Sequence, residues 1–348
     1  MAEEMKAAVL DEFGGRLRVD TRPVPRPGPE EALIRVLSCG TGLTIEWARV
    51  GRLGGSVPRV LGHEYTGTVA EVGPGVDSWR EGDVVTGSFY LFCGRCEMCS
   101  GGRETLCVNF EGYIGIHVDG AFAEYVVVPA RNLVPVPDGV PVREAGIIAD
   151  AVATPFHVAS QRAMIRPGDR VAVIGAGGGV GVHMAQVAKV FGGTVAAVDR
   201  DAEKLARLRS LGFDTVVDAS SERWPADLVE GLGSAPDVVI DMVGSTETLA
   251  AAWASLGVGG RFVSVAATPG VTMPVEPLQL VMREVVVTGT RYASRADIAA
   301  SLDLVRTGAV KCVVGARYPL DRVQEAMDAI AANKIFGRVL IDVAEEDA

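Results

Sequence analysis

The stretch that decides the fold is Arg170-Val171-Ala172-Val173-Ile174, followed directly by Gly175-Ala176-Gly177-Gly178-Gly179-Val180-Gly181 and then by an apolar helical pattern. The first run is typical of a buried parallel strand, and the glycines permit a tight turn and close approach of the backbone to a pyrophosphate. The helix that follows offers that anion free N–H groups and the positive end of its dipole. The predicted cofactor-binding residues of this loop are Gly175, Gly177, Gly178, Gly179, Val180 and Gly181.

An acidic residue at the end of the next predicted strand indicates which dinucleotide binds. Asp199 lies 18 residues after Gly181, close to the spacing at which a carboxylate accepts hydrogen bonds from the adenosine ribose. A carboxylate there repels a 2′-phosphate, whereas the neighbouring Arg200 could hold one. We therefore expect NAD(H) rather than NADP(H), with Asp199 and Arg200 at the cofactor.

Apolar strands and helical patterns alternate across residues 151–290, which predicts a parallel α/β sheet with crossover helices. Residues 1–150 are different, because short Val/Ile runs are separated there by Pro and Gly, a pattern typical of β-rich structure. The expected strands of this first part are Ala32–Val36, Gly67–Val72, Asp83–Thr86 and Ala123–Val128. Residues 291–348 add an amphipathic helix from about Ala293, a helix over Leu320–Ala332 and a strand over Arg338–Val343.

Length and composition narrow the function classes. The 348 residues favour two domains, and a content of 48% hydrophobic and 22% charged residues is typical of a soluble globular protein. A net charge of -11 disfavours binding to nucleic acid or to a membrane surface. The N-terminus lacks a signal-peptide pattern, and glycines interrupt the most apolar stretch, so we expect a cytoplasmic protein without a spanning helix.

Four of the six cysteines lie within fifteen residues, as Cys93-x2-Cys96-x2-Cys99-x7-Cys107. Four thiolates at this spacing can complete a tetrahedral Zn²⁺ shell. In a reducing compartment a metal is a better interpretation than two disulfides. Because all four positions are cysteine, no coordination position stays open, and the predicted zinc is structural.

These two features, in this order, resemble the zinc-containing alcohol dehydrogenases of the medium-chain dehydrogenase/reductase superfamily over nearly the whole chain. The supporting stretches are Gly62-His63-Glu64-Tyr65-Thr66-Gly67-Thr68-Val69, Asp119-Gly120-Ala121-Phe122-Ala123-Glu124-Tyr125-Val126 and Gly337-Arg338-Val339-Leu340. The resemblance implies a GroES-like β-rich catalytic domain over 1–150 with the zinc lobe at about 90–110, a doubly wound Rossmann domain over 151–290, and a return to the catalytic domain over 291–348. It also implies that Arg338 contributes to the cofactor site.

The resemblance further implies a catalytic zinc, but the sequence departs from the family's ligand pattern. Gly42 stands where the first cysteine ligand belongs, and Cys39 lies three residues earlier. His63 and Asp150 match ligand positions, and Glu64 matches a residue that can move onto the metal. A zinc ion held by His63, Glu64 and Asp150, and a metal-free proton-transfer cluster of the same residues, are both open. Thr44 matches the hydroxyl that carries the substrate proton, while Trp47 replaces the relay histidine.

Three hypotheses follow for the function. The first is an NAD(H)-dependent oxidoreductase that interconverts a small or medium alcohol and its aldehyde or ketone, with Thr44, His63, Glu64 and Asp150 as catalytic residues. The second is a reductase of activated double bonds or polarised ketones that lacks the catalytic zinc. The third is a non-catalytic NAD-binding redox sensor.

Further expectations concern the substrate, the assembly and one histidine. Family position suggests an apolar or aromatic substrate, lined by Leu43, Trp47, Phe89, Phe92 and Phe110. We expect a homodimer or homotetramer that pairs through the strand at 285–289. His183, on the helix after the glycine loop, is expected to be a packing residue.

Overall fold

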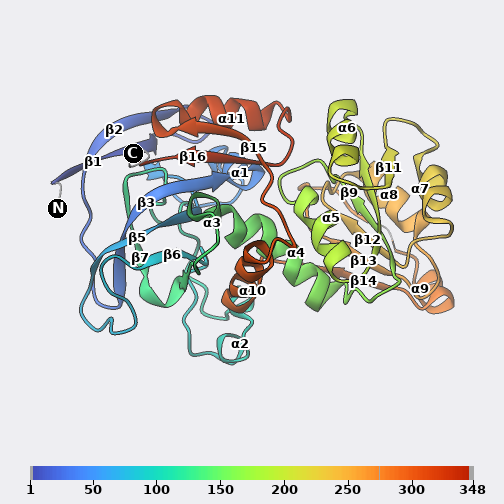
Figure 1. Cartoon of the computed structure of the whole chain (residues 1–348), viewed down its shortest axis with the longest axis horizontal. Helices are drawn as coiled ribbons and strands as arrows, with labels where there is room; N and C mark the ends of the chain where they lie inside the picture. The colour runs from blue at the N-terminus through green and yellow to red at the C-terminus, as the bar shows by residue number, and fades with distance from the viewer. Residues whose placement is uncertain (1–2, 274, 345–348) are drawn as a thin grey trace. The chain divides into compact units, whose positions relative to one another are not determined.

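Both ends of the sequence contribute to the first of two structural units (Figure 1). The computed structural model describes residues 3–273 and 275–344. The first unit comprises Met1–Ala153, Ala293–Gly308 and Val314–Ala348, and the second comprises Thr154–Tyr292 and Ala309–Val313. The short segment Ala309–Val313, expected within the final part of the first unit, therefore groups with the second unit.

The second unit contains a six-stranded parallel sheet in the order β11-β10-β9-β12-β13-β14. Its strands are β9 (Arg170–Ile174), β10 (Thr194–Asp199), β11 (Thr215–Asp218), β12 (Val238–Asp241), β13 (Arg261–Ser264) and β14 (Val286–Gly289). Its helices are α5 (Gly181–Val190), α6 (Ala202–Ser210), α7 (Trp224–Leu232), α8 (Thr246–Ser255) and α9 (Pro277–Arg283), and α4 (Ala153–His157) begins at its boundary. This strand order is that of a doubly wound Rossmann sheet, so the predicted fold class is confirmed.

Small buried residues in the central strands allow the helices to pack closely on this sheet. Ala172 of β9 and Ala196 of β10 are fully buried. They belong to a hydrophobic core that also includes Trp224, Leu228 and Phe262. Helix α5 packs against β9 and β10, which places its N-terminus at the carboxyl end of β9. The continuous apolar character of these strands follows from their burial on both faces.

The first unit is β-rich, as predicted. A seven-stranded sheet has the order β15-β16-β3-β5-β6-β8, with β7 paired to β3, and a smaller sheet has the order β2-β1-β4. The strands are β1 (Glu4–Leu10), β2 (Leu17–Pro23), β3 (Glu31–Thr41), β4 (Arg59–Val60), β5 (Glu64–Val72), β6 (Val84–Gly87), β7 (Tyr125–Pro129), β8 (Leu133–Pro135), β15 (Val314–Pro319) and β16 (Arg338–Asp342). The helices are α1 (Leu43–Arg49), α2 (Glu97–Ser100), α3 (Ala145–Ile147), α10 (Arg295–Arg306) and α11 (Val323–Ala331).

Strand pairing brings distant parts of the sequence together in the first unit. Strand β16 runs antiparallel to β3, with Leu340 opposite Gly40, and β3 runs antiparallel to β5, with Gly40 opposite Glu64. The C-terminal strand therefore adds to a sheet begun near the N-terminus. This register positions Arg338 and Glu64 near the end of β3.

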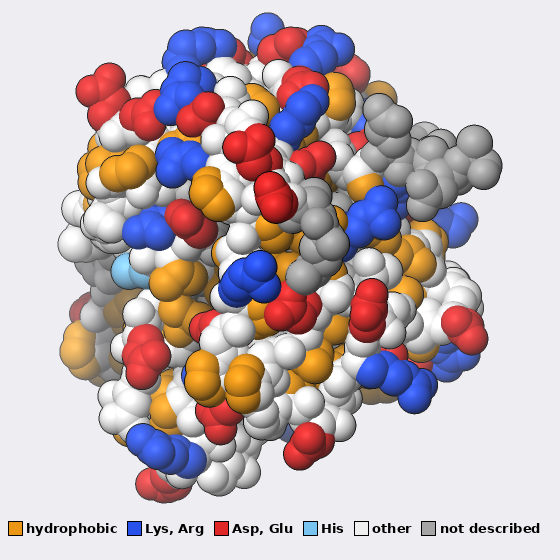
Figure 2. All heavy atoms as spheres, turned by 90° about the vertical axis from the view of Figure 1, so that its left-hand side faces the viewer, with side chains coloured by type: hydrophobic (Ala, Val, Ile, Leu, Met, Phe, Trp, Pro, Cys, Tyr) orange, Lys and Arg blue, Asp and Glu red, His pale blue; other side chains and the backbone are white. Residues whose placement is uncertain are grey.

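The surface of the first unit carries mixed charges on the face shown in Figure 2, where basic and acidic side chains are interspersed. A mixed surface of this kind offers no continuous basic patch on that face for a phosphate backbone. Within residues 3–273 and 275–344, none of the helices combines the length and apolar character needed to cross a membrane.

Candidate functional site

The glycine loop joins β9 to α5, and close contacts explain several of its glycines. Gly175 has a φ of +81°, in the left-handed region that favours glycine. A Cβ on Gly181 would lie 2.1 Å from the carbonyl oxygen of Gly175, and a Cβ on Gly177 would lie 2.8 Å from a carboxylate oxygen of Asp199. Gly178, Gly179 and Val180 are partly exposed, so an anion could approach the N–H groups at the start of α5.

Asp199 organises this loop as well as standing at the expected ribose position. Its carboxylate accepts hydrogen bonds from the backbone N–H of Gly177 at 2.8 Å, of Arg200 at 2.8 Å and of Asp201 at 3.2 Å. The carboxylate is therefore held at the carboxyl end of β10, beside the loop. Arg200 contributes its backbone N–H to this arrangement, and its side chain is exposed.

Lys204 is a candidate cofactor-site residue that sequence reasoning missed. Its side chain is buried, and a Cβ on Gly177 would lie 2.7 Å from the Cβ of Lys204. The Cβ and Cδ of this side chain thus pass the glycine loop, and a lysine ammonium that reaches a bound anion stabilises it. The available signal was a lysine in the first turn of the helix after Asp199.

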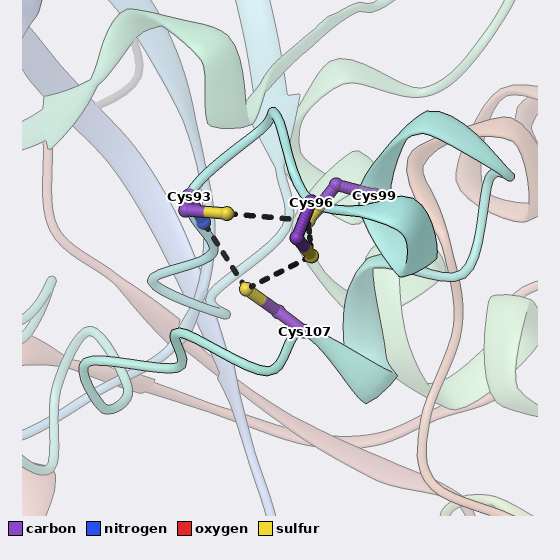
Figure 3. A group of neighbouring side chains, drawn as sticks. All are labelled: Cys93, Cys96, Cys99 and Cys107. Carbon is purple, nitrogen blue, oxygen red and sulfur yellow. Dashed lines mark hydrogen bonds between the residues drawn. The ribbon is translucent and has the colours of Figure 1, made fainter.

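The four clustered cysteines point toward one another in the first unit (Figure 3). The Sγ atoms of Cys96 and Cys99 lie 3.5 Å apart, those of Cys96 and Cys107 lie 3.9 Å apart, and those of Cys93 and Cys99 lie 4.0 Å apart. A tetrahedron with metal–sulfur bonds of about 2.3 Å has edges of about 3.8 Å. The four sulfurs therefore fit one zinc ion.

The chemistry of these thiols also suits a metal. All six cysteines of the chain are free. The backbone N–H of Arg95 and the side-chain amide of Asn109 stabilise the thiolate of Cys93 and lower its pKa to about 6. Zn²⁺ binds thiolates, so the environment of Cys93 favours the form that the metal requires, whereas burial raises the pKa of Cys99 to about 12.

A second cluster brings together three predicted residues that are distant in the sequence. His63 directly precedes β5, Glu64 is the first residue of that strand, and Asp150 lies in the helical turn Ile148–Val152. The His63 Nε2 atom lies 3.3 Å from Asp150 Oδ2 and 3.5 Å from Glu64 Oε1. All three side chains are buried, and burial lowers the pKa of His63, so its ring is neutral at pH 7.

Arg338 adds a positive charge to this cluster. Its Nε donates to Glu64 Oε2 at 3.0 Å, and its Nη2 donates to Glu64 Oε1 and, at 3.3 Å, to Asp150 Oδ2. Burial lowers the pKa of Arg338 to about 10, which leaves it charged at neutral pH. Sequence reasoning placed Arg338 at the cofactor, and that role stays a prediction, but its contacts with the two carboxylates were not foreseen.

Gly42 provides the space that this guanidinium occupies. A Cβ on Gly42 would lie 2.3 Å from Nη1 and 2.7 Å from Cζ of Arg338. The φ of Gly42 is -167°, an extended conformation available to any residue, so the constraint is steric. The space that a cysteine side chain would take at position 42 is thus occupied by the guanidinium of Arg338.

His63, Glu64 and Asp150 are close enough to share one ion, since their ligand atoms lie within 4.8 Å of one another, but they fit a catalytic zinc poorly. If Nε2 of His63 bound metal, its proton would have to lie on the buried Nδ1, which has no hydrogen-bond partner in the described part of the chain. A ligating histidine almost always donates that N–H. Gly42 supplies no ligand atom, and Arg338 already neutralises part of the carboxylate charge. No reaction step is therefore assigned to a metal here.

Thr44 and several aromatic residues complete the predicted site. Thr44 is partly exposed in the first turn of α1, and Phe89 contacts the edge of the His63 ring with 4.4 Å between centroids. Phe92 is 1% exposed and faces the guanidinium of Arg131, so its side chain belongs to the core and not to a substrate-accessible wall. Leu43 is exposed, and Trp47 and Phe110 are partly exposed.

Two family profiles match the chain. Residues 28–138 match the alcohol dehydrogenase GroES-like domain, and residues 179–307 match the zinc-binding dehydrogenase domain. An alcohol dehydrogenase of Moraxella sp. is 34% identical over 341 residues, which cover 97% of this chain and 99% of that protein. An L-threonine 3-dehydrogenase of Rhizobium rhizogenes is 35% identical over 276 residues, which cover 77% of this chain and 78% of that protein.

The fold is also similar to that of solved structures. The crystal structure of an NAD-dependent alcohol dehydrogenase superposes with a TM-score of 0.90 at 32% sequence identity, and the match covers 98% of this chain and 100% of that one. The likeness therefore extends over both units of the chain.

Proposed function

We infer that this chain, which belongs to the zinc-type medium-chain dehydrogenase/reductase family and is an oxidoreductase, interconverts an uncharged alcohol and its aldehyde or ketone with NAD(H). The observation that carries the proposal is the combination of a dinucleotide loop in the second unit with the buried His63, Glu64 and Asp150 cluster in the first. The oxidoreductase assignment leaves little support for a non-catalytic sensor.

The preference for NAD(H) rests on Asp199. Three backbone N–H groups fix its carboxylate beside the glycine loop, where a 2′-phosphate would meet a like charge. The exposed side chain of Arg200 is the one feature that could favour NADP(H). We propose NAD(H) as the physiological cofactor.

When held by the glycine loop and Asp199, NAD⁺ would supply the acceptor for the hydride of the carbinol carbon. Thr44 accepts the hydroxyl proton and passes its own proton toward His63, which is neutral and can take it. Asp150 and Glu64 stabilise the protonated ring, and Arg338 balances their charge. The hydride and the proton thus leave separate atoms, and the alcohol becomes a carbonyl compound.

The cysteine lobe is proposed to hold a structural zinc on Cys93, Cys96, Cys99 and Cys107. The ion would supply cross-linking of the loop between Cys93 and Cys107, because its four ligands leave no position for substrate. One zinc per chain is the expected content, since the second cluster fits zinc poorly.

The proposed substrate is a small or medium apolar alcohol, a class that includes aromatic alcohols. The partly exposed Trp47 and Phe110 support this class, whereas Phe89, which is 3% exposed beside His63, is buried like Phe92. Because Phe89 and Phe92 are both buried, the aromatic surface that a substrate could reach is smaller than the sequence suggested.

The test is NADH formation measured at 340 nm with a panel of primary, secondary and benzylic alcohols. Thr44→Val should abolish turnover while NADH binding is kept, because it removes the proton path alone. Thr21→Val, a matched change at an exposed threonine of β2, should leave both unchanged. Full activity of Thr44→Val would contradict the proposed proton route.

A second candidate function is favoured by one specific observation. The guanidinium of Arg338 occupies the space beside Gly42 and contacts both carboxylates, which suits a site without catalytic zinc. Such a site could reduce an activated double bond or a polarised ketone. NADH oxidation with α,β-unsaturated ketones, combined with no turnover of any alcohol, would favour this function over the first.

A homodimer or homotetramer is proposed through the edge of the parallel sheet. β14 is the terminal strand of that sheet, and its Val286 and Val287 are 47% and 40% exposed. Apolar side chains on an unpaired strand edge are typical of a surface that is covered by another chain. The molar mass in solution, from light scattering, tests this proposal.

A further inference from the structure

Helix α5, which begins at the dinucleotide loop, also holds the segment Ala309–Val313. The backbone N–H of Val313 donates to Nε2 of His183 at 2.9 Å. The backbone N–H of Lys311 donates to Oε1 of Gln186 at 2.9 Å, and Nε2 of Gln186 donates to the carbonyl oxygen of Lys311 at 3.1 Å. Three hydrogen bonds from two side chains of one helix thus attach this segment to the second unit.

His183 connects the segment to the loop through both of its ring nitrogens. Because Nε2 accepts a hydrogen bond from Val313, the proton of the neutral ring must lie on Nδ1. Nδ1 lies 2.7 Å from the carbonyl oxygen of Gly179, so it donates to the glycine loop. His183 is 0% exposed, and this single tautomer satisfies both partners.

The bond to Gly179 orients one peptide plane of the loop. In a trans peptide the C=O and the N–H point in opposite directions. When His183 holds the Gly179 carbonyl toward the body of α5, the N–H of Val180 points away from the helix, toward its N-terminal end. That is the direction from which an anion approaches a helix N-terminus.

The segment has an unusual place in the chain. It is the only part of residues 293–344 that groups with the second unit, and it directly joins α10 to β15, both of which belong to the first. Among the described residues, the chain therefore makes a second, short excursion into the second unit, and α5 is the helix that receives it. The sequence suggested only a packing role for His183.

We propose that His183 and Gln186 are positioning residues that couple occupation of the dinucleotide site to docking of Ala309–Val313. The proposal rests on the proposed NAD(H) site. Binding of the pyrophosphate at Val180 favours the orientation of the Gly179 peptide that His183 stabilises, and the same ring then accepts from Val313. By thermodynamic linkage, docking of the segment must raise the affinity for the cofactor by the same factor by which bound cofactor raises the equilibrium constant for docking.

The test measures NADH affinity by fluorescence titration and amide hydrogen exchange at Lys311 and Val313, with and without NADH. In the wild type, NADH should slow exchange at these two amides about tenfold, the equivalent of about 1.4 kcal/mol and of one hydrogen bond. His183→Asn can still donate to Gly179, but its amide oxygen does not reach the position of Nε2, which accepts from Val313. Gln186→Met keeps the length of the side chain and removes both bonds to Lys311.

In both variants, amide exchange in the segment should be faster and should change less when NADH is added. The Kd for NADH should rise about three- to tenfold, while kcat at saturating NADH stays within about twofold of the wild type. Lys189→Met is the matched control, because it removes a bond from the same helix to the carbonyl of Gly212, outside the segment. Its Kd and exchange rates should equal those of the wild type.

Each failure has a distinct meaning. If the wild type does not bind NADH, both the proposed cofactor site and this coupling are overturned. If it binds NADH with no change in exchange at Lys311 and Val313, or if both variants keep the wild-type Kd, the coupling alone is overturned. Should His183→Asn not fold, Gln186→Met carries the test, because Gln186 is only partly buried.

Discussion

Replacement of Gly42 by alanine should disrupt the buried charge cluster of the first unit. The added Cβ would lie 2.3 Å from Nη1 and 2.7 Å from Cζ of Arg338, whereas nonbonded heavy atoms prefer about 3.5–4.0 Å. The guanidinium must therefore move by about 1 Å or more. Such a shift breaks its hydrogen bonds to the two carboxylates. The bond from Nε to Glu64 is 3.0 Å long, and the bond from Nη2 to Asp150 is 3.3 Å long.

The expected cost follows from the burial of these charges. Loss of one partner from a buried ion pair destabilises a protein by about 3–5 kcal/mol. For a cooperative unit of about 150–250 residues, 3 kcal/mol corresponds to a fall in melting temperature of roughly 6–12 °C. Gly42→Ala should show a fall of this size in a thermal melt.

A double-mutant cycle tests the cause of this fall. On an Arg338→Met background, Gly42→Ala should cost much less than on the wild-type background, because the clashing guanidinium is absent. Gly42→Cys adds the thiol found in the family's ligand pattern, so zinc should partly restore its stability and raise its content above one ion per chain. Gly42→Ala, which has the same Cβ but no sulfur, is the control for this zinc effect.

Two results would refute the reasoning. A melting temperature of Gly42→Ala within about 1 °C of the wild type would show that the guanidinium does not need this space. Two zinc ions per wild-type chain, from elemental analysis, would show that His63, Glu64 and Asp150 hold a metal despite Arg338.

Four shorter predictions concern other parts of the molecule. Burial lowers the pKa of His183 from 6.5 to about 4, so between these pH values the unfolded chain takes up a proton that the folded chain does not. The free energy of unfolding should therefore fall by about 3 kcal/mol as the pH decreases from 6.5 to 4. Urea melts should show a flatter pH profile for His183→Asn. Cys107→Ser should lose the structural zinc, measured by elemental analysis, while Cys312→Ser retains it. Asp199→Ala should raise the ratio of NADPH to NADH affinity at least tenfold in fluorescence titrations, and an unchanged ratio would remove Asp199 as the source of the preference. Val287→Lys should reduce the molar mass measured by light scattering to that of a single chain, because it places a charge on the exposed edge of β14.

Much of the second unit could be predicted because its strands end at clear sequence signals, namely glycines or acidic residues. The strand Arg170–Ile174 was predicted with the bounds that the structure shows, since it is an apolar run that ends directly before a glycine. The strand β11 and the helix α7 were missed. β11 has only four residues and is partly exposed, so neither its length nor its hydrophobicity stands out.

The candidate site could be predicted as a set of residues but not as an arrangement. The resemblance identified His63, Glu64 and Asp150, and the structure brings them together. It could not identify the contacts of Arg338, because these depend on the pairing of β16 with β3 and on the space beside Gly42. A missing ligand is visible in a sequence, whereas the side chain that enters the resulting space is visible only in three dimensions.

The position of β16 between β3 and β15 has a consequence for synthesis of the protein. A ribosome delivers β3 early and β16 only after the whole parallel-sheet unit has been translated. Until then residues 38–41 of β3 lack their partner strand, although β7 can already pair with residues 31–35, and Glu64 and Asp150 lack the guanidinium that balances them. The parallel-sheet unit can therefore mature first, while the N-terminal segment waits with an exposed strand edge that is vulnerable to aggregation. A nascent chain that stalls before Arg338 would be a substrate for chaperones or proteases.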